Sequence, residues 1–157
     1  MKKVFLIFAI VTLCAFMTNA QEVVGKISNG NYVLTMNTNE IKSAGEALLA
    51  QQGITTKLTS FEILQDRVDG TGDIYYFLLA KNDYNSVKLA TTLSLKNNSF
   101  YPEGNYLLSN SATCTGCTKG CSPRRHADDG IIEWYCSDCT KGTGCKKTES
   151  SGFGLTR

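Results

Sequence analysis

Ile74-Tyr75-Tyr76-Phe77-Leu78-Leu79 is an unbroken run of apolar and aromatic residues between two turn-forming stretches, Asp69-Gly70-Thr71-Gly72-Asp73 and Asn82-Asp83-Tyr84-Asn85. A short apolar run enclosed by turn signals is typical of a β-strand. Because both connectors are short, the strands on either side are expected to pair with this run in antiparallel orientation. The run therefore predicts a strand of an antiparallel sheet.

The neighbouring segments carry the alternation expected of its partner strands. Phe61 and Ile63 flank Glu62, and a stripe of period two follows the second turn at Val87, Leu89, Thr91, Leu93 and Leu95. Nearer the N-terminus, Asn29-Gly30 divides residues 23–36 and supplies the positive φ angles of a type I′ turn. Two short strands are expected there.

One helix is expected between these strands. Asn37 can cap its N-terminus with Glu40 at the third helical position, and Gly53 offers a stop. Apolar residues repeat at helical spacing in between, at Ile41, Ala44, Gly45 and Leu48. The sequence thus predicts a helix over 38–52 packed on a curled antiparallel sheet, which is an α+β fold.

This order of elements resembles that of cystatin-like domains. Gln65-Asp66-Arg67-Val68-Asp69-Gly70, followed by an aromatic strand, is similar to the cystatin hairpin Q-x-V-x-G, with one extra residue between Gln65 and Val68. The resemblance covers residues 38–97, and the Trp-bearing second hairpin of inhibitory cystatins has no equivalent there. It implies a cystatin-like fold and, as one alternative, a cysteine-protease inhibitor that inserts the 68–72 hairpin into the protease cleft. The other interpretation is a polar loop that uses glycine for positive φ.

The N-terminus has the pattern of a signal peptide. A basic start at Lys2-Lys3 precedes an apolar run over 4–17 and small or uncharged residues before Gln21. The run is shorter than the roughly twenty residues that span a bilayer, so no membrane span is expected in the mature chain. Leu13 stands before Cys14, where lipoprotein signals carry a small residue, which argues against a lipid anchor. The protein is expected to be exported, to the periplasm or outside the cell.

Removal of this peptide leaves a neutral chain. The loss of Lys2 and Lys3 reduces the basic residues from 16 to 14, equal to the 14 acidic residues. Binding to nucleic acid or to an anionic membrane depends on clustered positive charge. Neither partner is predicted.

Six of the seven cysteines lie in the last third of the chain. Composition changes at residues 109–111, from apolar to rich in Cys, Gly, Lys, Thr and Ser. The predicted organisation is therefore a signal peptide (1–20), a cystatin-like α+β domain (21–110) and a small cysteine-rich module (111–157).

The spacing of these cysteines admits two chemistries. Two C-x2-C pairs have the spacing of a four-thiolate zinc site, formed by Cys114, Cys117, Cys136 and Cys139. In an oxidising compartment, an even number of cysteines in a short, core-poor segment favours disulfides instead. Three bridges use all six residues, and so does zinc with one bridge between Cys121 and Cys145. Connectivity stays open, since six cysteines allow fifteen pairings. Disulfides without a cofactor are the main prediction, and zinc is the alternative.

The sequence selects no catalytic group. Its only histidine, His126, lies in a mixed-charge loop, and no nucleophile elbow or phosphate-binding glycine loop is present. Trp134 and Tyr135 stand beside Cys136, where they can pack on the bridges or provide contacts to a partner. We predict a non-enzymatic binding protein whose partner is another protein or a cell-surface component. The candidate contact residues are Trp134, Tyr135, Val68 and Gly70.

Overall fold

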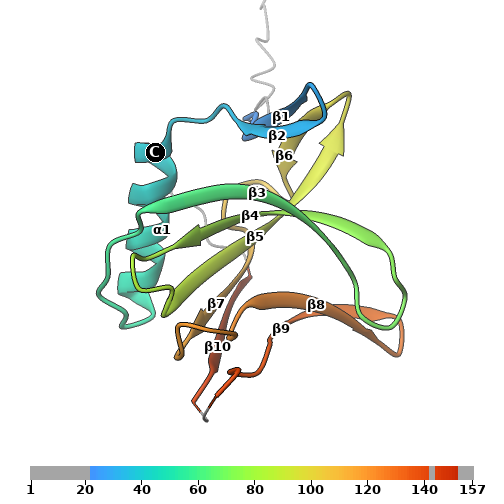
Figure 1. The fold of residues 1–157 in the computed structure, drawn as a ribbon. Helices are drawn as coiled ribbons and strands as arrows, with labels where there is room; N and C mark the ends of the chain where they lie inside the picture. Colours follow the sequence, from blue (N-terminus) through green and yellow to red (C-terminus); the bar gives the residue numbers. More distant parts are fainter. Residues whose placement is uncertain (1–21, 142–143, 152–157) are drawn as a thin grey trace, which may run out of the picture.

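The computed structural model describes residues 22–141 and 144–151 (Figure 1). The predicted signal peptide, including Cys14, lies outside these residues. In the part of the chain that is described, no helix is both long and apolar enough to cross a membrane.

The single predicted helix is confirmed. Helix α1 spans Thr38–Gln51, and the side chain of Asn37 accepts a hydrogen bond from the backbone N–H of Asn39 at 2.9 Å. Glu40 lies in its first turn, where a carboxylate interacts favourably with the helix dipole. Within the helix, the side chain of Glu46 accepts hydrogen bonds from Lys57 and from the Leu58 amide, which lie beyond the end of the helix, at 2.8 and 3.0 Å. These bonds fix the segment that leads from the helix into the sheet.

Eight strands form one antiparallel sheet that nearly closes on itself. The strands follow the order β10-β7-β5-β6-β1-β2, and β4 and β3 continue from the other edge of β5. Between the ends of this path, the Tyr32 hydroxyl of β2 donates a hydrogen bond to Gln65 Oε1 of β3 at 2.6 Å. The strand bounds are β1 Gly25–Ser28, β2 Asn31–Leu34, β3 Ser60–Arg67, β4 Ile74–Lys81, β5 Val87–Lys96, β6 Ser99–Pro102, β7 Asn110–Thr115 and β10 Lys146–Ser151.

The predicted hairpin turns are present. Asn29 and Gly30 both have positive φ, 51° and 77°, and join β1 to β2. The two turn-forming stretches around β4 connect it to β3 and β5 in antiparallel pairs. The α+β class, with one helix on an antiparallel sheet and a disulfide-bonded C-terminal region, is therefore confirmed.

Both faces of the central strands are buried, which explains the unbroken apolar run in β4. Leu78 faces a core that includes Ile41 of α1, whereas Tyr75, Phe77 and Leu79 face the opposite way, towards Trp134. The second face is covered by a separate two-stranded sheet, β8 (Pro123–Asp128) and β9 (Ile131–Cys136), here called the ribbon. In Figure 1 the ribbon lies below strands β3, β4 and β5 of the main sheet, while α1 stands to the left of these strands.

The cysteine-rich segment also extends the main sheet. Strand β7 begins at Asn110, where composition changes, and pairs with β5 on one side and β10 on the other. Ser111 and Thr113 are buried in this strand, and the Ser111 hydroxyl donates to the carbonyl of Leu108 at 3.0 Å. The polar boundary seen in the sequence is thus an internal strand of the sheet.

Candidate functional site

Three disulfides join the ribbon and its flanking loops to the sheet. They connect Cys114 to Cys136, Cys117 to Cys139, and Cys121 to Cys145, across sequence separations of 22, 22 and 24 residues. The first cysteines of the two C-x2-C pairs are therefore bonded to each other, and so are the second cysteines. In a chain-entropy model, a bridge closing a loop of this size stabilises the fold by roughly 3 kcal/mol.

These bonds argue against the zinc alternative. A zinc site needs free thiolates, whereas Cys114, Cys117, Cys136 and Cys139 are all bonded in disulfides. Across residues 22–141 and 144–151, no cluster of three or more His, Cys, Asp or Glu side chains is arranged to hold a metal ion. Three disulfides are typical of a protein from an oxidising compartment.

The ribbon has two different faces, set by the period-two alternation of its strands and by its register. Its inner face carries Arg125, Ala127, Ile132 and Trp134. Its outer face carries Arg124, His126, Asp128, Ile131, Glu133 and Tyr135.

Trp134 belongs to the core, so its predicted role as a surface contact does not agree with this structure. Its side chain is 3% exposed and meets the rings of Tyr75 and Phe77 edge-on, at 6.0 and 6.2 Å between centroids. The indole N–H donates to Asn110 Oδ1 at 3.2 Å. The guanidinium of Arg125 lies 5.7 Å from the Trp134 ring centroid, within the range of a cation–π interaction. Trp134 therefore anchors the ribbon to the sheet.

Tyr135 lies on the outer face, at the centre of a small polar and aromatic surface. Its hydroxyl donates a hydrogen bond to the carboxylate of Asp69, which belongs to the β3–β4 loop. Its ring meets that of His126 edge-on, at 5.5 Å between centroids. Burial, followed by the bond to Asp69, raises the pKa of the Tyr135 phenol. The phenol is therefore neutral at physiological pH.

Backbone contacts hold the β3–β4 loop beside the ribbon. The Asp69 N–H donates to the Arg125 carbonyl, and its carbonyl accepts from the Ala127 N–H, both at 2.9 Å. Gly70 has a φ of 98°, and a Cβ there would lie 3.1 Å from the Ala127 carbonyl oxygen. Figure 1 shows this loop and the β8–β9 turn next to each other at the right of the view. The loop and the ribbon therefore form one continuous surface.

The remaining predicted contact residues divide between core and surface. Val68 is 3% exposed and packs with Tyr75 and Trp134, so its side chain cannot contact a partner in this structure. Gly70 is exposed at the tip of the loop. The inhibitor hypothesis uses the 68–72 hairpin, and the exposed tip of that hairpin consists of Gly70, Thr71 and Gly72. That hypothesis stays a prediction.

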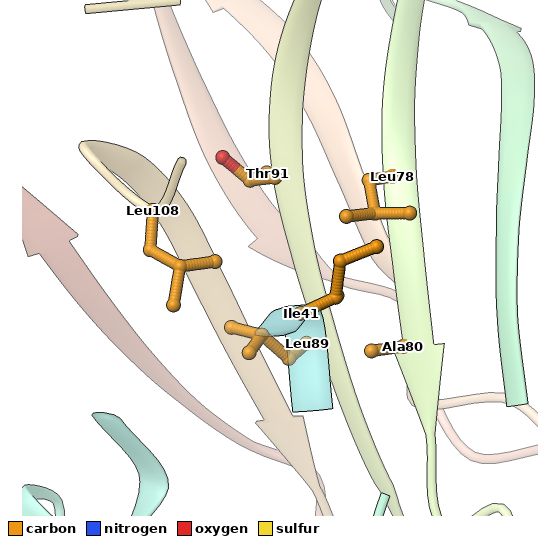
Figure 2. Close-up of a pocket in the computed structure, with 6 residues that line it drawn as sticks. All are labelled: Ile41, Leu78, Ala80, Leu89, Thr91 and Leu108. Carbon is orange, nitrogen blue, oxygen red and sulfur yellow. The ribbon is translucent and has the colours of Figure 1, made fainter. Parts of the chain in front are cut away.

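A small cavity lies in the core rather than at this surface. It measures about 10 Å³ and lies between α1 and the sheet, where Ile41 points towards strands β4 and β5 (Figure 2). This is about the space of one water molecule. The lining is apolar except for Thr91, whose hydroxyl already donates to the Leu107 carbonyl at 2.8 Å. The cavity is too small for an organic ligand.

No protein-family model, curated protein or solved structure matches this chain.

Proposed function

We propose that this protein is an exported, non-enzymatic binding protein that contacts another protein or a cell-surface component through the outer face of the ribbon. The observation that carries the proposal is the fixed position of Tyr135, held by its bond to Asp69 and its contact with His126. A rigid aromatic side chain with a polar end loses little conformational entropy on binding, and tyrosine is enriched at binding hot spots.

The surroundings of Tyr135 support this role. Arg124, Glu133 and Ile131 are exposed on the same face, and Ile131 keeps 62% of its surface accessible. Charged residues around an aromatic centre match the polar rim and apolar core of protein interfaces. The disulfides hold the small ribbon in one conformation, which lowers the entropic cost of binding.

The state of the cysteines leaves out one enzymatic alternative, a catalytic thiolate. All six in the C-terminal region are bonded in disulfides, so none of these sulfurs is a thiolate nucleophile.

The test measures binding of the labelled mature chain to cells of the organism that exports it. These cells carry a deletion of the gene for this protein, so that no unlabelled copy competes. We expect saturable binding that Tyr135→Ala weakens at least about tenfold, the effect of a hot-spot residue. Tyr84→Ala is the matched control, because Tyr84 is 77% exposed in the β4–β5 turn, away from the ribbon. Equal binding by both variants would contradict the proposal, as would no binding at all. Protease treatment of the cells distinguishes a protein partner from another surface component.

A further inference from the structure

The ribbon covers an apolar face of the main sheet without being part of that sheet. Its strands bond to each other and not to the eight-stranded sheet. Its described backbone contacts with the β3–β4 hairpin are the two at Asp69. A two-stranded hairpin is at best marginally stable alone in water. The ribbon therefore depends on its side-chain contacts and its bridges.

The apolar contacts of the ribbon are few, and its polar contacts are single interactions of Trp134, Tyr135 and Arg125 with neighbouring segments. Of the ribbon, Trp134 is the residue buried in the core on this face, and the partly buried Ala127 packs against that core. Ile132, also on the inner face, is 41% exposed. By contrast, the two cores that bind α1 to the sheet contain no ribbon residue. The helix-bearing side of the fold can thus persist without the ribbon.

Two bridges hold the ends of the ribbon directly. Cys136, at the end of β9, is bonded to Cys114 of β7, and Cys121, just before β8, is bonded to Cys145, just before β10. Cys117 and Cys139 join two loops outside the strands. The first two bridges therefore attach the ribbon to the sheet, and the third closes the loops beside it.

We infer that the ribbon is a redox-released cover: reduction of the Cys114–Cys136 and Cys121–Cys145 bridges detaches it and exposes the apolar face beneath. The reductant is a dithiol. Each bridge takes two electrons and two protons from one dithiol, which leaves two cysteine thiols and one oxidised, disulfide form of the reductant. The exposed face comprises Tyr75, Phe77, Leu79, Ala90 and Ala112.

The chain contains its own reporter of this release, independent of any binding partner. Trp134 is the only tryptophan, and it is buried at the contact between ribbon and sheet. When the ribbon detaches, the indole enters water and its fluorescence shifts to longer wavelength. The two cores that pack helix α1 on the sheet contain no ribbon residue, so hydrogen exchange of the α1 amides should change little.

The experiment compares wild type and two serine double variants by tryptophan fluorescence and hydrogen exchange, with and without dithiothreitol. Reduced wild type, which has lost both attaching bridges, should show the red shift and at least about 100-fold faster exchange of ribbon amides, because the loss of one bridge of this loop size already accounts for about that factor. Cys114→Ser with Cys136→Ser opens one attaching bridge, so it should show about 100-fold faster exchange and reach the full red shift only when dithiothreitol also opens Cys121–Cys145. Amides of α1 should stay protected. Cys117→Ser with Cys139→Ser is the matched control and should keep Trp134 buried until dithiothreitol is added. An unshifted spectrum in fully reduced protein would overturn the inference, and so would loss of protection in α1 together with the ribbon.

Discussion

The Tyr135 hydroxyl donates a hydrogen bond to the carboxylate of Asp69, a residue 66 positions earlier in the chain. This bond crosses strand β8 and joins the β3–β4 loop to the outer face of the ribbon. It brings a residue of the aromatic sheet region and a residue of the cysteine-rich region into one surface. The proposed binding site depends on both segments.

Loss of this bond should loosen the ribbon without unfolding the protein. Tyr135→Phe keeps the ring on His126 and removes only the hydroxyl, so we expect the free energy of unfolding to fall by about 1 kcal/mol. Asp69→Ala should cost a similar amount, and the double variant little more, because both changes remove the same bond. Urea denaturation of the three variants measures this coupling. Strictly additive losses would show that the two groups do not interact.

Trp134 should contribute far more to stability than any residue of the outer face. Trp134→Ala removes a buried indole from its contact with Tyr75 and Phe77, and we expect a loss of about 3–5 kcal/mol. Trp134→Phe keeps an aromatic ring but loses the bond to Asn110, so its cost should be smaller. Thermal unfolding followed by circular dichroism tests this order, with Tyr84→Ala as the exposed control. A Trp134→Ala protein as stable as the control would place Trp134 outside the core.

Alkaline pH should weaken the contact between ribbon and sheet through Tyr75. Burial raises the pKa of Tyr75 to about 12 from the ordinary value of 10.0. The folded state therefore holds this proton more tightly than the unfolded state does, and the stabilisation is complete below pH 10 and is lost as the pH rises towards 12. The free energy of unfolding of wild type should fall over this window. Tyr75→Phe should show a shallower fall, whereas Tyr84→Phe should follow wild type.

Local signals in the sequence were sufficient for the helix, the hairpin turns and the strands around β4. Asn37 caps the helix with its own side chain, and Asn29-Gly30 adopts positive φ because of its residue types. Each of these features depends on residues within a few positions. The sequence therefore predicts them without knowledge of the tertiary fold.

The sequence does not indicate strand β7, because the residues of this strand are polar. Ser111 and Thr113 are buried between β5 and β10, where polarity usually indicates a loop. Burial is tolerated at Ser111 because its hydroxyl bonds to the Leu108 carbonyl. No pattern in the sequence shows in advance that such a partner is available.

The sequence indicates the surface around Tyr135 only in part. The position of Trp134 and Tyr135 beside Cys136 identifies both as candidates, yet adjacent positions on one strand face opposite ways. Either Trp134 or Tyr135 could point inward. The choice depends on the register of β9 against β8, and on which face of the ribbon the disulfides hold against the sheet. The pairing of the cysteines has the same origin, because it reflects the proximity of β7 to β9 in space.

The central claim is that three disulfides cross-link the C-terminal region. Disulfide mapping of the mature, non-reduced chain tests this claim most directly. We expect an intact mass six hydrogens below that of the reduced chain. Proteolysis under non-reducing conditions should release the linked pairs Cys114–Cys136, Cys117–Cys139 and Cys121–Cys145. Free thiols, a zinc mass on the native chain, or a different pairing would contradict the account.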